Sequence, residues 1–492
     1  MTQLSYGRAM DWLAEREPDR PAVVCEADGS EAPAERRTRT ELIARSNRFA
    51  RSFAAHGVGP GDLVTIALPN GCAFFEAALA AWKIGATPNP VSARLPEAEQ
   101  RAIIETASPA LVLGATPSVC GERPVLPADF EPDPGIDAGP LPEIVSPHVR
   151  AMTSGGSTGR PKVIIDANPA LCDPEQPENR MKPGGRLLAP GPLYHAGPFI
   201  TSWQALLCGG TVHVQRRFDP RRCLECIERE RIDWVLFVPT MMQRIWKLPE
   251  AEREAFDLSS LETVMSSGAA SPPWLKRAWI DWLGPDVIWE AYGGSERIGG
   301  TLVSGREWLA HPGSVGRPTA GRRVRILDEE GKERATGEVG LVYFLPPGGA
   351  GSTYHYLGAT GRRTEDGWET LGDLGYVDED GYLYLTDRET DMIVTGGANV
   401  YPAEVEAAID AFGPVRSSAV IGLPDEDLGQ RVHALVDAPE GFDESALVAH
   451  LEKQLVRYKV PRSFESVDEP LRDDAGKVRR SALRAARIPR RA

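Results

Sequence analysis

The sequence lacks any long apolar run, and this argues against a membrane-spanning protein. No stretch approaches the roughly 18 consecutive apolar residues that a spanning helix needs. The first residues, Met-Thr-Gln-Leu-Ser-Tyr-Gly-Arg, contain no apolar segment of the kind found in signal peptides. We therefore expect a cytoplasmic protein.

Cysteine is scarce, with seven residues among 492, and no paired framework is visible. An odd, scattered set in a long chain is typical of a reducing compartment. Cys223 and Cys226 form the one CxxC pattern, inside a helical-looking run. Because no second pair and no neighbouring histidine accompany them, we expect helix packing rather than a zinc site.

Positive charge is also short, since 55 Lys and Arg face 70 Asp and Glu for a net charge of −15. This balance argues against general affinity for nucleic acid or anionic membranes. The exception is residues 472–491, where eight basic residues accompany two aspartates. This segment is either a local anion-facing patch or a solvated tail.

What is present is typical of a large globular enzyme, with 42% apolar and 25% charged residues. A chain of this length exceeds a single core, so we expect at least two domains. Helical patterns at 38–56, 73–84 and about 96–107 alternate with apolar strands at 63–68 and 110–113. Such alternation predicts an α/β fold with a largely parallel sheet.

Three later regions differ from this rhythm. Residues 114–148 are rich in Pro, Gly and acid and show little periodicity, which indicates an irregular excursion. Short β segments around 314–345 predict a small β-rich subdomain. A third unit begins near Asp387, where residues 392–422 read in β-α-β order, with a helix over 400–409.

The stretch Thr153–Lys162 combines three glycines, hydroxyl residues and a terminal lysine. Glycines let backbone N–H groups approach an anion, and Lys162 adds a mobile positive charge. The stretch is not a Walker loop, because Arg-Pro follows its last glycine. It predicts oligophosphate binding, with a mobile Gly/Ser surface loop as the alternative.

Six further stretches combine small residues with groups that can do chemistry. Alone, each has a plain structural interpretation: His195 as a packed or capping histidine, Asp373 as a turn residue, and Lys477 as part of a solvated basic face. The stretches are Pro192–Pro198, Ser266–Pro272, Glu290–Glu296, Thr370–Gly375, Thr386–Asn399 and Asp473–Arg480.

In this order, the stretches resemble the core motifs of the adenylate-forming (ANL) superfamily, which includes acyl-CoA synthetases. The resemblance runs from about residue 20 to about residue 487, and residues 388–406 are most similar to stand-alone bacterial acyl-CoA ligases. It implies an N-terminal adenylation domain of mixed, mostly parallel sheets over residues 1–387. It also implies a mobile α+β C-terminal domain over residues 388–492 that carries the catalytic lysine.

The resemblance also implies roles for individual residues, with ATP, Mg²⁺ and CoA as cofactors. Lys477, His195, Ser295 and Glu296 are the expected catalytic residues, and Glu296 is the expected metal ligand. The expected phosphate loop comprises Thr153, Ser154, Gly155, Gly156, Ser157, Thr158, Gly159 and Lys162. The other expected nucleotide and CoA contacts are Gly268, Ala269, Ala270, Glu290, Ala291, Tyr292, Gly293, Asp373, Arg388, Gly397 and Arg431.

These roles describe an ATP-dependent acid–CoA ligase that forms an acyl-adenylate, releases pyrophosphate and passes the acyl group to CoA. A second interpretation keeps adenylation but changes the acceptor to a carrier-protein thiol or an amine, or activates nitrite for diazotisation of an aryl amine. A third is a non-catalytic nucleotide-binding protein, against which the intact Lys477 and Glu296 argue. The residues leave open the acid and the choice between monomer and homodimer. The expected acyl pocket comprises residues 195–203, Met241, Met242, 266–270 and 293–301.

Overall fold

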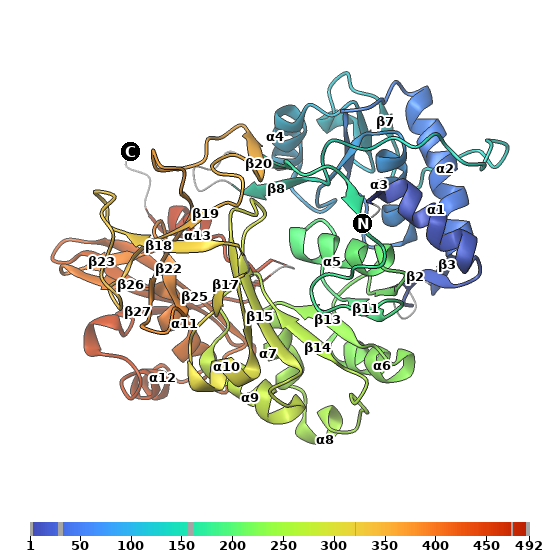
Figure 1. Cartoon of the computed structure of the whole chain (residues 1–492). Coiled ribbons are helices and arrows are strands. Elements are labelled where there is room, and N and C mark those ends of the chain that lie inside the picture. The colour runs from blue at the N-terminus through green and yellow to red at the C-terminus, as the bar shows by residue number, and fades with distance from the viewer. Residues whose placement is uncertain (1–2, 28–32, 156–160, 320, 474–475, 489–492) are drawn as a thin grey trace.

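The computed structural model describes residues 3–27, 33–155, 161–319, 321–473 and 476–488, apart from the side chains of residues 154 and 155. Figure 1 shows a helix-rich N-terminal part, drawn in blue, at the opposite side of the molecule from the orange and red C-terminal unit. The green and yellow middle of the chain lies between them.

A nine-stranded sheet forms the centre of the molecule. Its strands from β15 to β2 run parallel, while β3, β16 and β17 add antiparallel edges. This confirms the predicted mostly parallel sheet. The order is β17 (Arg317–Pro318), β16 (Gly300–Ser304), β15 (Ile288–Gly293), β14 (Thr263–Ser266), β13 (Trp234–Phe237), β11 (Arg186–Ala189), β12 (Thr211–Val214), β2 (Pro21–Cys25) and β3 (Glu35–Thr38). Its connecting helices are α5 (Ala196–Leu207), α6 (Pro220–Glu230), α7 (Pro239–Trp246), α8 (Glu250–Arg253), α9 (Pro273–Leu283) and α10 (Gly305–Ala310).

A second, four-stranded parallel sheet belongs to the N-terminal part. Thr38 and Glu41 form a capping box at the start of its helix α2, as the Thr-Glu spacing predicts. Residues 114–148 contain one short turn of helix and the edge strand β7, which the sequence analysis missed because a two-residue strand has no readable period. The elements are β5 (Thr87–Pro90), β4 (Leu63–Ile66), β6 (Leu111–Leu113), β7 (Val125–Leu126), α1 (Tyr6–Arg16), α2 (Arg39–Ala55), α3 (Cys72–Lys83) and α4 (Glu97–Ala107).

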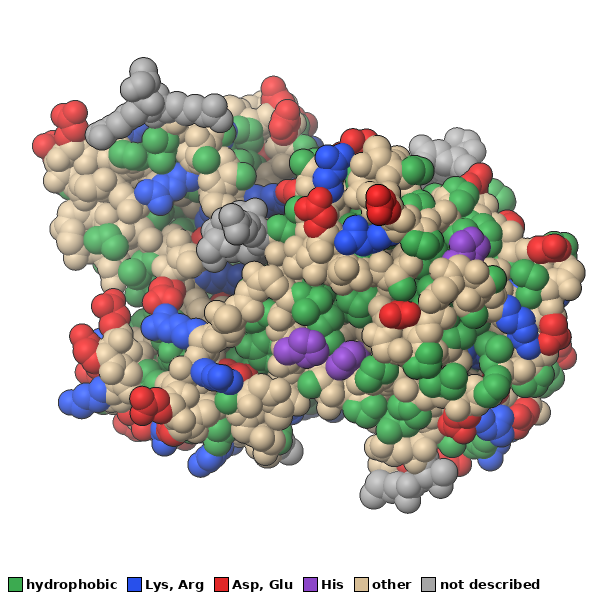
Figure 2. Space-filling model, turned by 90° about the horizontal axis from the view of Figure 1, so that it is seen from above, with side chains coloured by type: hydrophobic (Ala, Val, Ile, Leu, Met, Phe, Trp, Pro, Cys, Tyr) green, Lys and Arg blue, Asp and Glu red, His purple; other side chains and the backbone are tan. Residues whose placement is uncertain are grey.

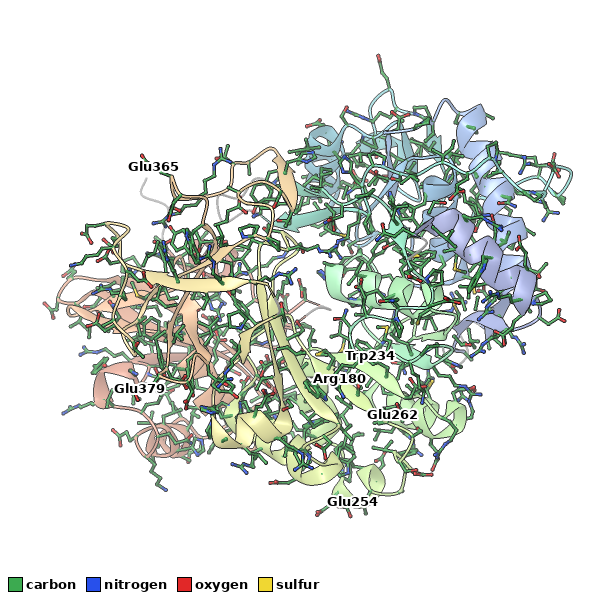
Figure 3. All side chains as sticks on the ribbon, viewed as in Figure 1. Arg180, Trp234, Glu254, Glu262, Glu365 and Glu379 are labelled. Carbon is green, nitrogen blue, oxygen red and sulfur yellow. The ribbon has the colours of Figure 1, made fainter. Side chains whose placement is uncertain are left out.

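Aromatic side chains of α3, in the N-terminal part, pack against those of α5, which connects strands of the central sheet. Trp203 is fully buried, and its ring lies 4.6 Å from Trp82 and 5.6 Å from Phe75, centroid to centroid. Trp203 therefore belongs to the core rather than to the expected acyl pocket. Along β13, the indole of Trp234 donates a hydrogen bond of 2.9 Å to the carbonyl of Asn179 (Figure 3).

Two antiparallel sheets follow, and the four-stranded one, which includes β18 and β19, confirms the β-rich region predicted around residues 314–345. The three-stranded sheet places β9, which follows the glycine-rich stretch, between its two partners. The strands are β8 (Ala151–Gly155), β9 (Pro161–Asp166) and β20 (Tyr354–Leu357) in this sheet, and β18 (Arg323–Leu327), β19 (Gly340–Leu345), β21 (Glu369–Val377) and β22 (Leu383–Arg388) in the other. A small pair, β1 (Leu4–Ser5) with β10 (Leu171–Cys172), lies apart.

The C-terminal unit has its own core, in which Val405, Ile409 and Val420 are fully buried. Its β-α-β order agrees with the prediction, but the helix begins at Pro402 instead of residue 400. Proline suits the first helical position, and Val400 is paired in a hairpin. The elements are β23 (Ile393–Thr395), β24 (Ala398–Val400), α11 (Pro402–Asp410), β25 (Ser417–Asp425), β26 (Gly429–Asp437), α12 (Glu444–Leu451), β27 (Ser463–Ser466) and α13 (Arg480–Arg487).

Within the described residues, no helix combines the length and the apolar character needed to cross a bilayer.

Candidate active site

Four loops meet at one edge of the nine-stranded sheet. They follow β11, β13, β14 and β15, which are parallel neighbours, so their carboxyl ends share that edge. In open α/β sheets this edge is where ligands bind. His195, Gly268 and Glu296 lie in the segments that follow β11, β14 and β15, and Thr240 lies in the first turn of α7, which follows β13.

Lys162 and Glu296 form a polar cluster with Tyr356. The ammonium of Lys162 lies 3.2 Å from Glu296 Oε1 and 2.8 Å from the hydroxyl of Tyr356. Tyr356 in turn donates a 2.6 Å hydrogen bond to Glu296 Oε1. One cation and one buried carboxylate are thus held at the start of β9, where the glycine-rich stretch ends.

Asp373 and Arg388 form a second cluster on neighbouring strands. They face each other in the β21–β22 register, with 3.4 Å between Arg388 Nε and Asp373 Oδ1. The hydroxyl of Tyr292 donates a 2.6 Å hydrogen bond to Asp373 Oδ2. Burial raises the pKa of Tyr292 well above its usual value, so this phenol stays protonated as a donor. The cluster presents carboxylate lone pairs that can accept vicinal hydroxyls.

His195 caps the start of α5 and packs against Tyr194, with ring centroids 4.5 Å apart. Burial, with a smaller effect of the Lys477 charge, lowers the pKa of His195 to about 3. The imidazole is therefore neutral at physiological pH. Its Nε2 is buried without a hydrogen-bond partner among the described residues, as expected of a group that awaits a ligand.

Lys477 reaches the same region from the C-terminal unit. The preceding Gly476 packs so closely that a Cβ there would lie 2.6 Å from Thr240 Oγ1 and 3.5 Å from Val238, which also contacts Gly268. Burial, which removes water from around the ammonium, lowers the pKa of Lys477, and the Arg388 charge lowers it further. Glu296 acts in the opposite direction on the same pKa. The lysine still contacts solvent, as a side chain in an open cleft does.

Basic side chains gather in the recess of the molecule, which favours an anionic ligand although the net charge is −15. Figure 2 shows that the molecule is hollowed between two lobes, with Lys and Arg side chains in the recess. Two buried atoms, Thr153 Oγ1 and His195 Nε2, have no hydrogen-bond partner in the described part of the chain and add local hydrogen-bonding capacity. These donors and the Glu296 carboxylate suit a nucleotide triphosphate with a hard divalent cation.

Comparisons with known proteins decide the family. The AMP-binding enzyme family matches residues 10–354, and the AMP-binding enzyme C-terminal domain matches residues 404–477. The chain belongs to the AMP-binding enzyme family. It is an adenylate-forming acid–CoA ligase that uses ATP, Mg²⁺ and CoA and proceeds through an acyl-adenylate.

Named relatives and solved structures agree with this assignment. A feruloyl-CoA synthase from Amycolatopsis is 35% identical over 465 residues, which cover 91% of this chain and 93% of the relative. ATP-bound MatB from Rhodopseudomonas palustris is 26% identical, with a TM-score of 0.80 and coverage of 98% and 99%. The o-succinylbenzoate CoA synthetase from Bacillus subtilis, at 23% identity, shares the fold over 100% and 99% of the two chains with a TM-score of 0.81. These likenesses do not favour the alternative acceptors.

The predicted phosphate loop of this ligase is described only in part. Gly156, Ser157, Thr158 and Gly159 lie outside the described residues. The main chain of Ser154 and Gly155 belongs to β8, where these residues pair with Lys162 and Pro161. The two described ends of the stretch, residues 153–155 and 161–162, therefore lie side by side in one sheet.

The turns near Glu296 hold most of the remaining predicted residues. Ser295 and Glu296 occupy the turn between β15 and β16. Gly268 has φ +89°, a left-handed conformation that favours glycine, and it begins the turn that contains Ala269 and Ala270. Ser267 ties this turn to β15 by donating a 2.8 Å hydrogen bond to the carbonyl of Ala291. Gly293 ends β15 and is exposed.

Three predicted residues lie apart from this arrangement. The carboxylate of Glu290 forms a buried ion pair with Lys276, at 2.5 Å, so any contact with nucleotide is left to its main chain. Gly397 lies in the exposed turn between β23 and β24. Arg431 lies on β26 and donates to the carbonyl of Pro424 at 3.2 Å. Among the described contacts, none joins Gly397 or Arg431 to the Glu296 cluster.

The sequence analysis missed several residues that support the site. Tyr356 is the clearest, because only the β9–β20 pairing brings it to Lys162. Asp166 is another, since its buried carboxylate lies 3.2 Å from Arg297 and 3.7 Å from Arg150. Arg297 has φ +55°, and this ion pair holds the turn directly after Glu296. An alternating Tyr354-His-Tyr356 pattern was the one available sequence signal.

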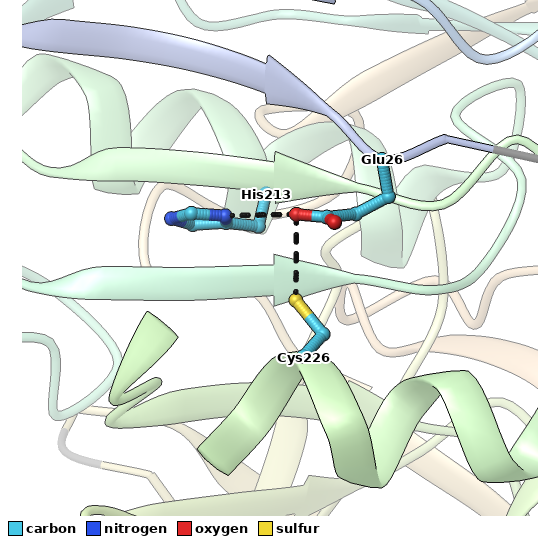
Figure 4. A group of neighbouring side chains, drawn as sticks. All are labelled: Glu26, His213 and Cys226. Atoms are coloured by element: carbon cyan, nitrogen blue, oxygen red, sulfur yellow. Dashed lines mark hydrogen bonds and ion pairs between the residues drawn. The ribbon is translucent and has the colours of Figure 1, made fainter. Parts of the chain in front are cut away.

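A separate group of potential metal-ligand atoms lies where β2 and β12 end (Figure 4). Atoms of Glu26, His213 and Cys226 lie within 4.8 Å of one another. Hydrogen bonds already engage them: His213 Nδ1 lies 3.2 Å from Glu26 Oε1, and Arg229 donates to Glu26 Oε2. Cys223 and Cys226 are both buried in the core on α6, as helix packing predicts. We interpret the group as a hydrogen-bonded part of the core.

Proposed function

We propose that adenylation takes place between Lys477, Glu296 and Lys162, and that the acid is aromatic. When a carboxylate attacks the α-phosphorus, two anions must approach each other. The ammonium of Lys477 offsets this repulsion at the point where the new bond forms. Mg²⁺ held by Glu296 would withdraw charge from the phosphates. The single observation that carries this proposal is the position of Gly476 against Thr240 and Val238, which delivers Lys477 to the cleft.

We propose that the second cluster holds the nucleoside. Asp373 has lone pairs for the ribose hydroxyls, and Arg388 lies beside it, with 3.4 Å between Arg388 Nε and Asp373 Oδ1. The adenine would be bordered by the turn from Gly268 to Ala270 and by the Ala291–Gly293 main chain. The hydroxyl of Tyr292 would hold Asp373 in place through its hydrogen bond. Ser295 would donate to the α-phosphate, and the phosphate loop from Thr153 to Lys162 would hold the other phosphates.

We propose that residues 1–387 and 388–492 are the two domains and that the second moves between half-reactions. Few direct contacts cross between them near α7, where Gln243 Nε2 donates to the carbonyl of Asp410 at 3.4 Å and Lys247 donates to that of Val415. Polar contacts of this kind suit domains that separate and close again. Movement would withdraw Lys477 and bring Gly397 towards the cleft, with Arg431 facing the phosphates of CoA.

We propose an aromatic carboxylic acid for two reasons. The Amycolatopsis relative at 35% identity is a feruloyl-CoA synthase. In addition, the aromatic core behind α5 is closed, since Phe199 and Trp203 are fully buried, so a long alkyl chain has no path between α5 and α3. A flat ring would instead lie near His195, whose Nε2 is buried without a hydrogen-bond partner among the described residues.

The acid class is tested by ATP–pyrophosphate exchange with cinnamic and hydroxycinnamic acids against octanoic and hexadecanoic acids. The proposal predicts that an aromatic acid supports at least tenfold faster exchange, equivalent to about 1.4 kcal/mol. Faster exchange with a fatty acid would contradict the aromatic pocket without affecting the ligase assignment.

We also infer a cytoplasmic location. It is consistent with the seven cysteines, all of which are described and none of which forms a disulfide.

A further inference from the structure

Strand β20 lies directly over the Glu296 turn and the start of β9. Tyr356 pairs with Ile164 in the antiparallel register, and Lys162 is two residues from Ile164 on the same face of β9. Diagonal neighbours on one sheet face are within reach of long side chains. The sheet register therefore brings Tyr356 to Lys162, although the two residues are 194 positions apart.

The three polar groups have a fixed direction of hydrogen bonding. An ammonium can only donate and an ionised carboxylate can only accept, so the phenol between them must accept from Lys162 and donate to Glu296. The distances are 2.8 Å and 2.6 Å, and the lysine nitrogen lies 4.1 Å from the centre of the phenol ring. Burial, followed by the Glu296 charge, raises the pKa of Tyr356, which keeps its proton available for donation.

The residue that directly precedes β20 holds the main chain of Glu296. Thr353 Oγ1 donates a 2.9 Å hydrogen bond to the Glu296 carbonyl. Thr353 thus fixes the backbone of Glu296, and Tyr356 of β20 fixes its carboxylate. Because Tyr356 and Lys162 both contact Oε1, we expect Oε2 to be the oxygen that turns towards a metal ion.

We propose that Tyr356 is a positioning residue for adenylation: its phenol orients the Glu296 carboxylate for the metal and holds Lys162 ready for the phosphates. This inference rests on the proposed role of Glu296 as the metal ligand. Hydrogen-bond partners of metal ligands typically change metal affinity 10- to 100-fold when removed. A tyrosine that served only for packing, against the ring of Tyr354 at 4.8 Å, would have no such effect.

The direct test is Tyr356→Phe, which removes the hydroxyl and keeps the ring. ATP–pyrophosphate exchange is measured across a Mg²⁺ titration, and transfer to CoA is measured separately from preformed acyl-adenylate. We expect the half-saturating Mg²⁺ concentration to rise about tenfold or more. We expect the transfer step to change less than twofold, since it does not involve the metal. Tyr376→Phe is the matched control, because that ring stacks on Tyr384 and is remote from the cluster.

A parallel titration of Glu296→Gln separates the proposed role of Tyr356 as a positioning residue from the proposed role of Glu296 as the metal ligand. If Glu296→Gln raises the Mg²⁺ requirement and Tyr356→Phe does not, the role of Tyr356 is wrong and the role of Glu296 stands. If neither variant changes it, both roles are wrong. Should Tyr356→Phe fail to fold, as judged by thermal unfolding, Thr353→Val is titrated instead. An unchanged Mg²⁺ requirement in that variant would likewise overturn the positioning of Glu296 by residues 353–356.

Discussion

Arg479 forms an ion pair with Glu99, with 2.5 Å between Arg479 Nη1 and Glu99 Oε1. The pair joins the C-terminal segment that carries Lys477 to helix α4 of the N-terminal part. In the domain movement proposed above, the pair would exist only in the arrangement that presents Lys477 to the cleft. Both side chains are about half exposed, at 54% and 43%, so the pair would bias that arrangement without locking it.

Glu99→Gln should weaken adenylation selectively. An exposed ion pair contributes up to about 1 kcal/mol, which corresponds to at most a fivefold change in the equilibrium between domain arrangements. We expect ATP–pyrophosphate exchange to fall by up to that factor, with transfer from preformed acyl-adenylate unchanged or faster. High salt should abolish the difference, because exposed pairs are screened.

Glu97→Gln, at an exposed position on the same helix, is the control for this change. An equal loss in both half-reactions would show that Glu99 supports the fold of α4 instead of the domain arrangement.

Lys477→Gln should abolish adenylation and spare transfer to CoA. The lysine is the charge that reaches the cleft from the C-terminal unit, and loss of one preorganised donor typically costs about 10²–10³-fold in rate. Exchange and acyl transfer are measured on the same preparation, with the exposed Lys453→Gln as control. Parallel loss of both activities would remove the assigned role.

Asp373→Ala should make the enzyme indifferent to the ribose hydroxyls. Hydrogen bonds to a charged group contribute about 1.5–3 kcal/mol, so the unaltered enzyme should use 2′-deoxy-ATP roughly 10- to 100-fold less well than ATP. In the variant this ratio should approach one, whereas Tyr292→Phe should reduce it only in part. An undiminished ratio in Asp373→Ala would place the ribose elsewhere.

His195 should make the fold sensitive to acid. Its pKa of about 3 lies below the unfolded value of 6.5 because of burial and, secondarily, Lys477. Between these values the unfolded chain binds more protons, so stability is fully present above pH 6.5 and declines as pH falls towards 3. In His195→Gln, the decline in Tm from pH 6.5 to 4.5 should be shallower. The exposed His56→Gln should leave the slope unchanged, and equal slopes in all three proteins would contradict this origin.

The general fold could be predicted because its signals are local. The Thr38–Glu41 capping box and the apolar strands at the centre of the chain follow from short-range patterns. Two features could not be predicted in this way. Strand β7 has too few residues to show a pattern, and the start of α11 depends on the β23–β24 hairpin.

The site divides in the same way. Asp373, Glu296 and Lys477 are visible as motif residues, and the parallel pairing of β14 and β15 explains why the segments that carry Gly268 and Glu296 leave the same edge of the sheet. The place of Tyr356 depends on strand register across nearly two hundred residues, which no local pattern encodes. The Glu290–Lys276 ion pair likewise depends on how α9 packs on β15.

The most direct test of the central claim is a rapid-quench experiment with ATP labelled at the α-phosphate and an acid that supports exchange. Without CoA, the account predicts that enzyme-bound acyl-adenylate accumulates to about one equivalent per site, with release of pyrophosphate. Addition of CoA should convert it to acyl-CoA and AMP within a turnover. Formation of ADP, or decay of the adenylate at the same rate with and without CoA, would contradict the account.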